Sequence, residues 1–380
     1  MHIPFNKPFL LGNETIYIEQ AVRSGKISGD GIFTKKCHTF FEDKYGFKKA
    51  LLTTSCTDAL EMCAILLDIK AGDEVIVPSY TFVSTVNAFL LRGAKPVFMD
   101  SKKEHPGMDE HQIEALITSK TKAIVVVHYA GVACNMDVIM NIANRHNLFV
   151  VEDAAQAIDS FYTDKTGTVK PLGSIGHLAA FSFHETKHII SGEGGLLAIN
   201  DERFIERAEI IREKGTNRSK FFRGEVDKYN WVDIGSSFLP SDIIAAFLYA
   251  QLEHISTIQA KRIALWNTYN DGLQQIKNKI QLPFIPNYAT NNAHMYYLVC
   301  NSLEERTALI KHLKDADILA VFHYLSLHKS PFYEKKHDAR NLPLADHYSD
   351  CLVRLPMYFE LEIDTLKNRI LEAILAFYSV

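Results

Sequence analysis

Short apolar segments alternate with helical segments between residues 49 and 199, and this alternation constrains the fold more than any other feature of the chain. The apolar segments predict strands, and the stretches between them predict helices at 57–67, 82–91 and 136–145. The predicted strands are 49–53, 74–77, 95–99, 123–127, 148–152, 178–183 and 196–199. This pattern indicates an α/β fold in which helices cover both faces of a mostly parallel sheet.

The alternating pattern stops near residue 250. A long helix is expected over roughly 240–273, and shorter elements follow it. We therefore predict a large domain over 1–250 and a smaller C-terminal α/β domain over 251–380. Ligands of such sheets bind beyond the carboxyl ends of the strands, so the large domain is expected to hold the functional site.

Charge and composition argue against several classes of protein. The formal net charge is -4 and the basic residues are scattered, which argues against binding of nucleic acid or an anionic membrane. There is no apolar run of about 18 residues and no signal-peptide pattern at the start, so a cytoplasmic protein with reduced cysteines is expected. The 6 cysteines lack a CxxC pair and the 16 histidines lack metal-ligand spacing, so no metal site is predicted.

Two charged residues follow predicted strands in the middle of the chain. Asp153 comes directly after the strand at 148–152, and Lys187 follows the strand at 178–183. A carboxylate and an amine at the same edge of a sheet can form a plain ion pair. They can also anchor pyridoxal phosphate, whose aldehyde bonds a lysine and whose ring nitrogen pairs with a carboxylate. The order of the two residues and their neighbours favour the second interpretation.

A turn from strand to helix near residue 55 offers a place for phosphate. Ser55 and Thr57 lie where the helix begins, and free backbone N–H groups at a helix N-terminus attract phosphate. Taken alone, a capped helix without a ligand is the commoner arrangement. Phe82 can stack on a flat cofactor ring or pack in the core, and the sequence does not decide between the two. Gln156 can likewise donate a hydrogen bond to a phenolic oxygen or cap a turn.

Five segments occur together in a characteristic order. They are Ser-Cys-Thr-Asp-Ala-Leu (55–60), Val-Pro-Ser-Tyr-Thr-Phe (77–82), Glu-Asp-Ala-Ala-Gln-Ala (152–157), Phe-Ser-Phe-His-Glu-Thr-Lys (181–187) and Gly-Glu-Gly-Gly (192–195). In order and spacing the chain resembles the DegT/DnrJ/EryC1/StrS family of sugar-nucleotide aminotransferases over essentially its whole length. The resemblance implies the aspartate-aminotransferase fold (PLP fold type I) with a seven-stranded sheet, pyridoxal 5'-phosphate as cofactor, and a homodimer with shared active sites.

The resemblance also implies roles for single residues. Lys187 would form the Schiff base and Asp153 would hold the ring nitrogen, and these two make up the catalytic pair. Most family members have an asparagine that reaches the cofactor phosphate of the neighbouring subunit, and Ser237 stands in its place here. The other implied cofactor contacts are Ser55, Cys56, Thr57 and Ser182 at the phosphate, Gln156 at the ring hydroxyl and Phe82 on the ring face.

A later region is similar to one branch of the family, the dTDP-4-amino-4,6-dideoxygalactose transaminases. The similar segments are 212–219, 221–224, 227–229 and 231–237. The branch implies amination of dTDP-4-keto-6-deoxy-D-glucose at C4 by L-glutamate, giving dTDP-4-amino-4,6-dideoxy-D-galactose and 2-oxoglutarate. Such products feed bacterial surface polysaccharides, including lipopolysaccharide and enterobacterial common antigen. Amination at C3 or to the C4 gluco epimer stays open, as does a non-catalytic regulator that binds the cofactor.

Six further residues are candidates for contact with a sugar nucleotide. Three lie in the aromatic segment 322–328, where the small domain of family members closes on the site, although packed or solvated histidines are commoner in such segments. Two are basic residues that can meet the diphosphate or remain solvated, and one precedes Lys187 by three positions. The six are His184, Arg223, Lys228, His323, Tyr324 and His328.

Overall fold

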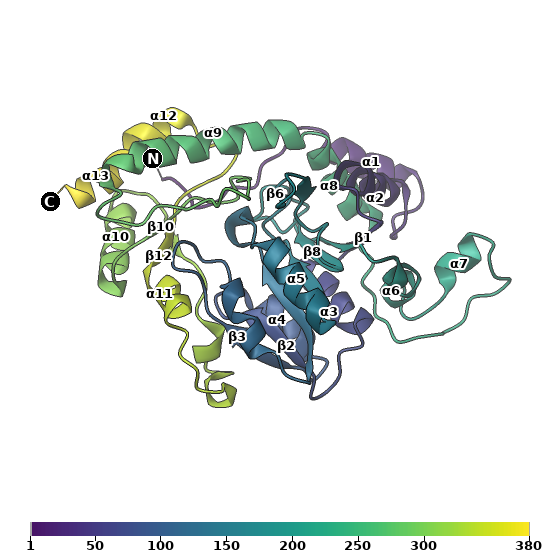
Figure 1. Cartoon of the computed structure of the whole chain (residues 1–380). Coiled ribbons are helices and arrows are strands. Elements are labelled where there is room, and N and C mark those ends of the chain that lie inside the picture. The colour runs from purple at the N-terminus through teal and green to yellow at the C-terminus, as the bar shows by residue number, and fades with distance from the viewer. Residues whose placement is uncertain (1, 380) are drawn as a thin grey trace.

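Seven strands form the central sheet in the order β1-β9-β8-β5-β4-β2-β3, in a computed structural model that describes residues 2–379 (Figure 1). β9 runs antiparallel to β1 and β8, and the remaining neighbouring pairs are parallel. The mostly parallel seven-stranded sheet is therefore confirmed. The strands are β1 (Lys49–Thr53), β2 (Glu74–Pro78), β3 (Lys95–Met99), β4 (Thr121–Val127), β5 (Phe149–Asp153), β8 (Leu178–Ser182) and β9 (Gly195–Ile199).

Helices cover both faces of this sheet, and each face has its own hydrophobic core. Successive strand residues point to opposite faces, so Leu51 belongs to one core and Leu52 to the other. The first core includes residues of α3 (Cys56–Leu66), α4 (Val83–Leu90) and α6 (Ile205–Arg212). The second includes residues of α2 (Ile32–Tyr45), α5 (Met136–His146) and α8 (Asp242–Leu252).

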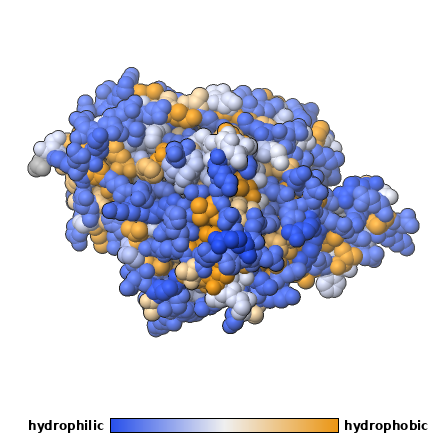
Figure 2. Space-filling model, viewed as in Figure 1, coloured by the Kyte–Doolittle hydropathy of each residue, from blue (hydrophilic) through white to orange (hydrophobic). Residues whose placement is uncertain are grey.

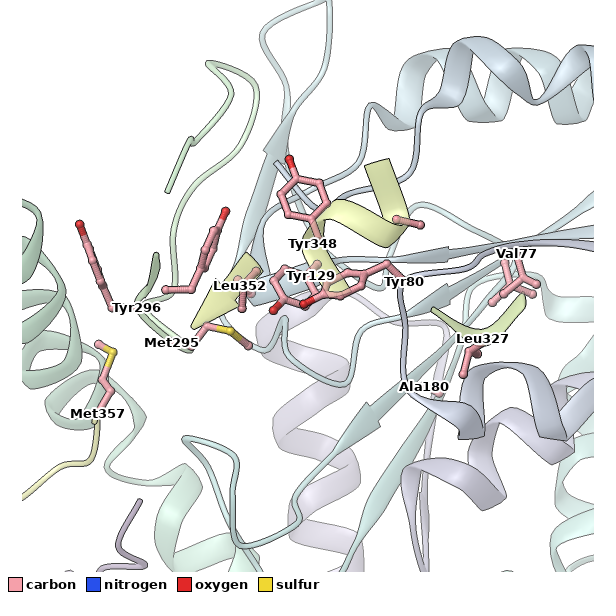
Figure 3. Packing of buried hydrophobic residues seen from close by; sticks show 14 of the residues in the cluster. Val77, Tyr80, Tyr129, Ala180, Met295, Tyr296, Leu327, Tyr348, Leu352 and Met357 are labelled. Carbon is pink, nitrogen blue, oxygen red and sulfur yellow. The ribbon is translucent and has the colours of Figure 1, made fainter. Parts of the chain in front are cut away.

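The chain from α9 onward, residues 255–378, is called the C-terminal part. It contains a second, antiparallel sheet with the order β10-β12-β11. The first core continues into this part, and Figure 3 shows Tyr80 and Tyr129 beside Leu352 and Tyr348. The backbone of Ile3 also pairs with Ile318. The proposed division at residue 250 stays a prediction. The elements are α9 (Ile255–Leu273), β10 (Tyr297–Val299), α10 (Leu303–Asp315), β11 (Val321–Phe322), α11 (Pro343–Cys351), β12 (Leu352–Arg354), α12 (Ile363–Thr365), a π-helical turn (Leu366–Leu371) and α13 (Glu372–Tyr378).

The single long helix expected over 240–273 is wrong. The chain forms α8 and then α9, with a break at Glu253 and His254. α8 packs in the core shared with α2, whereas Trp266 and Tyr269 of α9 pack against Tyr296 in the C-terminal part. α9 begins in the same core as α8, with Ile255 and Ile258, and its later residues continue into the other core. No glycine or proline marks this break, and hydrophobic periodicity alone therefore did not reveal it.

One segment projects from the body of the molecule. α7 (Arg218–Phe222) and the loop after it extend to the right of Figure 1, and hydrophobic residues lie on their surface in Figure 2. Trp231 is 81% exposed and Phe222 is 65% exposed.

The remaining elements are α1 (Glu14–Arg23), which packs on α8, and the hairpin of β6 (Phe161–Thr163) and β7 (Val169–Pro171). Among residues 2–379 no helix is long and apolar enough to cross a membrane.

A buried carboxylate on α8 holds the start of α2. The N-cap of α2 is Gly31, which has no side chain to accept a hydrogen bond from the first turn. Instead, Asp242 accepts hydrogen bonds from the Thr34 backbone N–H, the Thr34 hydroxyl and the Phe33 backbone N–H. A Cβ on Gly31 would lie 2.3 Å from the Asp242 carboxyl carbon, so the glycine is needed for this close approach.

We expect Asp242→Ala to lower the free energy of unfolding by about 2 kcal/mol, because it leaves buried donors without a partner at a helix N-terminus. The measurement is urea unfolding of the purified variant. Asp43→Ala, which removes an exposed carboxylate from α2, serves as the control and should change stability little. Equal stability of the two variants would contradict the conclusion that Asp242 stabilises the start of α2.

Candidate active site

A cavity of about 460 Å³ opens at the carboxyl ends of β4, β5 and β8, within the size range of small-molecule sites. The C-terminal part closes one side of it. Its lining includes most of the residues singled out in the sequence. Those lining residues are Ser55, Cys56, Thr57, Phe82, Asp153, Gln156, Ser182, His184, Lys187, His323 and Tyr324.

Asp153 is the last residue of β5 and is buried. Its Oδ2 accepts a hydrogen bond of 2.6 Å from the Thr85 hydroxyl, and its Oδ1 accepts one of 3.1 Å from the Ala155 N–H. Burial raises the pKa of the Asp153 carboxyl despite these bonds. A cation at the carboxylate would compensate for this loss of hydration.

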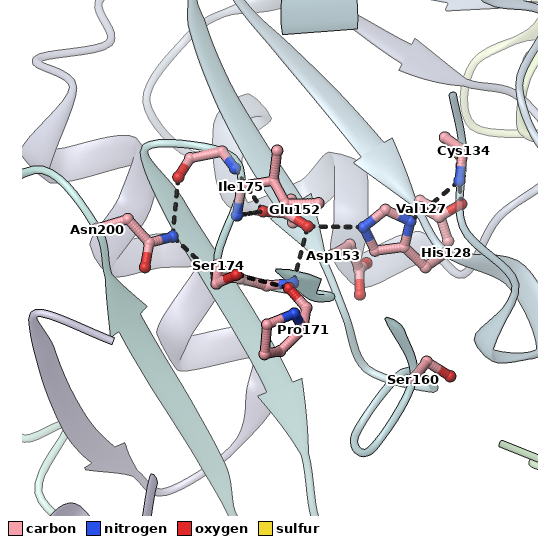
Figure 4. Close-up of polar contacts among 12 residues, drawn as sticks. Val127, His128, Cys134, Glu152, Asp153, Ser160, Pro171, Ser174, Ile175 and Asn200 are labelled. Carbon is pink, nitrogen blue, oxygen red and sulfur yellow. Dashed lines mark hydrogen bonds and ion pairs between the residues drawn. The ribbon is translucent and has the colours of Figure 1, made fainter. Parts of the chain in front are cut away.

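The neighbouring carboxylate, Glu152, points to the other side of the strand. It accepts hydrogen bonds from the ring of His128 and from the backbone N–H groups of Gly173, Ile175 and Gly176 (Figure 4). Burial alone would raise its pKa, but these donors hold the pKa of Glu152 below its usual value. Glu152 therefore fixes the end of β5, and with it the position of Asp153.

Lys187 lies beyond the end of β8 and lines the same cavity. Burial lowers the pKa of its amine. Within the described part of the chain, Lys187 forms no ion pair with Asp153 or with any other carboxylate. The alternative of a plain ion pair between Asp153 and Lys187 is therefore not observed. Both side chains can contact a molecule bound between them.

The start of α3 forms a polar rim of the cavity. Ser55 caps the helix by accepting a hydrogen bond from the Asp58 N–H, and the Thr57 hydroxyl donates to Ser84. A Cβ on Gly195 would lie 2.3 Å from the Ser55 carbonyl carbon, so glycine allows β9 to approach this turn. Burial raises the pKa of the Cys56 thiol well above its usual value, which keeps it protonated.

Residues 323–324 reach the cavity from the C-terminal part. The Gln156 side chain accepts from the Ala130 N–H and donates to the Tyr324 hydroxyl. Tyr324, whose φ is 50°, places its ring 6.0 Å from that of Phe82. The His323 ring forms a hydrogen bond of 2.7 Å with the Tyr129 hydroxyl. Together these contacts join the C-terminal part to the ends of the strands.

Four predicted site residues lie outside the cavity of this single chain. His328 is buried against Ser79, with 2.7 Å between its Nδ1 and the serine hydroxyl, in agreement with the alternative of a packed histidine. Arg223 pairs with Glu209 and Glu225. The other two are Lys228 and Ser237, which are exposed on the projecting segment and at its end.

Several lining residues were not identified from the sequence. Thr85 hydrogen-bonds Asp153 from within α4, where nothing in the sequence distinguishes it. His294 lies 3.2 Å from His188, measured between the two Nδ1 atoms, and burial lowers the pKa of His188 to about 3. Arg354 is the last residue of β12 and lines the cavity from the C-terminal part. Their sequence separation from Lys187 explains why only the fold reveals them.

The polar groups of the cavity suit a phosphorylated, cationic ring. Asp153 would hold a protonated ring nitrogen, and the start of α3 would hold a phosphate. A side chain at position 195 would collide with the backbone of Ser55 and Cys56 at the start of α3. The fold and this cavity define the class of aminotransferases that use pyridoxal 5'-phosphate.

Comparison with known proteins identifies the family. The model of the DegT/DnrJ/EryC1/StrS aminotransferase family matches residues 11–374, so the chain belongs to this family. It is 31% identical over 382 residues to the spore coat polysaccharide biosynthesis protein SpsC of Bacillus subtilis, covering 98% of this chain and 96% of SpsC. It is also 34% identical over 333 residues to the uncharacterized protein MJ1066 of Methanocaldococcus jannaschii, covering 86% and 85%.

Solved structures agree with this assignment. The putative sugar aminotransferase Spr1654 of Streptococcus pneumoniae, in its PLP form, superposes with a TM-score of 0.89 at 25% identity, covering 99% of this chain and 100% of that one. DesV of S. venezuelae superposes with a TM-score of 0.90 at 28% identity, covering 100% and 99%. The chain is an aminotransferase, and its cofactor is pyridoxal 5'-phosphate.

We expect Asp153→Asn to have opposite effects on stability and turnover. The raised pKa means that folding opposes ionisation of Asp153, so the cofactor-free protein loses stability as the pH rises from the usual aspartate pKa through the raised one. Near neutral pH the cofactor-free variant should therefore melt at a higher temperature than the parent, and the difference should shrink in acid. Turnover should fall by roughly 100-fold because a charge-assisted contact at the reacting centre is lost.

Differential scanning fluorimetry with and without cofactor measures the first effect. Addition of cofactor should raise the melting temperature of the parent more than that of the variant. A cofactor-free variant that melts below the parent at neutral pH would contradict the conclusion that the buried, ionised Asp153 destabilises the cofactor-free protein.

Proposed function

We propose that this protein transfers the amino group of L-glutamate to C4 of dTDP-4-keto-6-deoxy-D-glucose, giving dTDP-4-amino-4,6-dideoxy-D-galactose and 2-oxoglutarate. Amination of a keto sugar is the broader statement, supported by the relatives named for polysaccharide biosynthesis and as a sugar aminotransferase. The particular substrate is supported by the similarity of segments 212–219, 221–224, 227–229 and 231–237 to the branch that makes this amino sugar.

The observation that carries the proposal is the placement of Lys187 and Asp153 in one cavity without an ion pair between them. Pyridoxal 5'-phosphate, when bound, draws electrons away from the carbon that carries the transferred amine. Asp153 would hold the ring nitrogen protonated, since a carboxylate favours the cationic form. Lys187 would bond the cofactor and, once released, move the proton at the reacting carbon, because its lowered pKa leaves more of the amine neutral.

The other lining residues would orient the cofactor. Ser55, Thr57 and Ser182, which line the cavity, would donate hydrogen bonds from their hydroxyl groups to the cofactor phosphate at the N-terminus of α3. Gln156 would contact the ring hydroxyl. Phe82, which is 55% exposed and precedes α4, would cover one face of the ring.

A homodimer completes the proposal. The projecting segment exposes Trp231, Phe222 and Val232, and apolar side chains gathered on a projecting segment are typical of a surface covered by a partner. Ser237 lies at the end of this segment, and it would reach the cofactor phosphate of the second subunit. Arg223 and Lys228, which lie outside the cavity of their own chain, would then lie near the nucleotide of the neighbouring site.

To test the substrate, the purified protein is incubated with L-glutamate and a panel of keto sugar nucleotides, and the products are analysed by mass spectrometry and NMR. We expect the amine at C4 in the galacto configuration. Lys187→Ala should retain cofactor but give no product. In the parent protein, borohydride should attach the cofactor to the peptide that contains Lys187. An amine at C3, the gluco epimer, or label on another peptide would each contradict part of the proposal.

The shared site is tested with mixed dimers of Ser237→Asp and Lys187→Ala subunits. Each parent should be inactive, because one repels the phosphate and the other lacks the amine. In a mixed dimer, the site with Lys187 receives Ser237 from the partner, so one of its two sites should recover. Ser236→Asp, an exposed neighbour, serves as the control for added charge. An active monomer in light scattering, or no recovery on mixing, would contradict the shared site.

A further inference from the structure

Thr85 donates the shorter of the two hydrogen bonds that reach the buried carboxylate of Asp153. Its hydroxyl lies 2.6 Å from Asp153 Oδ2, whereas the Ala155 N–H lies 3.1 Å from Oδ1. Burial raises the pKa of the Asp153 carboxyl, and the Thr85 hydroxyl opposes this rise more than the Ala155 N–H or the charge of Lys187 does. Thr85 is therefore the protein group that favours the ionised form of Asp153 most.

The hydroxyl of Thr85 does not follow the pattern of other helical threonines in this chain. Thr268 and Thr307 each donate to the backbone carbonyl of the residue four positions earlier, as threonines in helices often do. For Thr85 the residue four positions earlier is Thr81, and its hydroxyl lies 2.9 Å from the Thr85 hydroxyl. Both threonines are buried and line the cavity beside Asp153. The Thr85 hydroxyl is thus directed away from its own helix, α4, and toward the end of β5.

The direction of these hydrogen bonds follows from the number of protons available. An ionised carboxylate only accepts, so Thr85 donates its single hydroxyl proton to Asp153. In the contact between the two threonines, Thr81 must therefore be the donor. The two hydroxyl groups form a chain whose protons all point toward Asp153, and such a chain strengthens the final hydrogen bond.

Glu152 shows what the number of donors does at this place in the fold. It is buried like Asp153, but four groups donate to it, and they hold its pKa below the usual value. Asp153 has two donors, and its pKa lies above the usual value. Loss of Thr85 would leave Asp153 with the Ala155 N–H alone among these donors.

We propose that Thr85 is a positioning residue that orients the Asp153 carboxylate and keeps it ionised for the ring nitrogen of the cofactor, an inference that rests on the proposed role of Asp153. Thr85 holds Oδ2 and Ala155 holds Oδ1, so the carboxylate is fixed at both oxygens. Each oxygen keeps a further lone pair for a ligand in the cavity. An Asp153 with a higher affinity for protons would compete with the ring nitrogen for its proton, so Thr85 would support the reaction through Asp153.

Other ionisable groups also face Asp153, and none of them is changed in the test below. The charges of Lys187, beyond β8, and His128, after β4, both favour the ionised carboxylate. Three further groups come from α3 and the C-terminal part, and burial raises the pKa of each, so they are uncharged near neutral pH. They are Cys56, Cys63 and Tyr324.

The first test measures melting temperatures of the cofactor-free protein in acid and at neutral pH. Because the pKa of Asp153 is raised by folding, its ionisation lowers stability as the pH rises. Thr85→Val removes the hydroxyl and should raise this pKa further, so it should melt below the parent by more at neutral pH than in acid. Thr85→Ser keeps the hydroxyl and should follow the parent.

Two controls separate this effect from a general loss of stability. Thr268→Val removes a partly buried helical hydroxyl that bonds a backbone carbonyl, so its difference from the parent should be the same at both pH values. When Thr85→Val is added to Asp153→Asn, the further loss should also be independent of pH, because no carboxylate remains at position 153.

The second test uses the enzyme loaded with cofactor that carries ¹⁵N at its ring nitrogen. The NMR chemical shift of this nitrogen reports its protonation, and in Thr85→Val the proton should be lost at a lower pH than in the parent. The rate of the donor half-reaction with L-glutamate should fall by roughly 10-fold, the loss expected for one hydrogen bond to a charged group. Thr85→Ser should restore both.

Three results would overturn the proposal. They are a loss of melting temperature in Thr85→Val that is equal in acid and at neutral pH, a loss that keeps its pH dependence in Asp153→Asn, and a Thr85→Ser variant that behaves like Thr85→Val. If Thr85→Val does not fold, Thr81→Val should show a smaller loss with the same pH dependence, and a loss independent of pH would overturn the proposal. The cofactor-free measurement needs no sugar nucleotide, so its result stands even if the proposed substrate is wrong.

Discussion

The end of β5 is the point on which the site depends. Two consecutive carboxylates lie there, and the alternation of strand side chains sends them to opposite sides. Glu152 is satisfied by His128 and by three backbone N–H groups, so it anchors the strand. Asp153 keeps fewer partners and faces the cavity with a raised pKa. Glu152, whose oxygens are fully hydrogen-bonded, thereby fixes the position of Asp153, whose carboxylate can bind a cationic ligand.

The cavity exists because the C-terminal part packs against the carboxyl edge of the large sheet. The first hydrophobic core runs from α3 and α4 into the C-terminal sheet, so the two parts share one apolar interior. Tyr324 meets Gln156 across the opening, and Arg354 enters from β12. The large sheet supplies the lysine and the carboxylate, and the C-terminal part supplies the side chains that line the other side of the cavity.

The sequence predicted the residues whose chemistry is local. Asp153, Lys187 and the Ser55–Thr57 turn each follow an apolar strand, and parallel strands bring their carboxyl ends to one edge. Their meeting in one cavity therefore follows from the strand pattern. His328 was a weaker prediction, because an aromatic segment does not tell whether a histidine faces a ligand or, as here, packs against Ser79. The break between α8 and α9 was missed because both helices continue the same apolar periodicity.

The sequence by itself determined the class of fold, the family and the order of the cofactor motifs, because these depend on local periodicity and on short segments. Only the tertiary structure decided which distant residues complete the site. Thr85, His294 and Arg354 are separated from Asp153 by 68, 141 and 201 positions, so no spacing rule connects them. They meet because two hydrophobic faces bury against each other, and the packing of those faces depends on the whole chain rather than on any one segment.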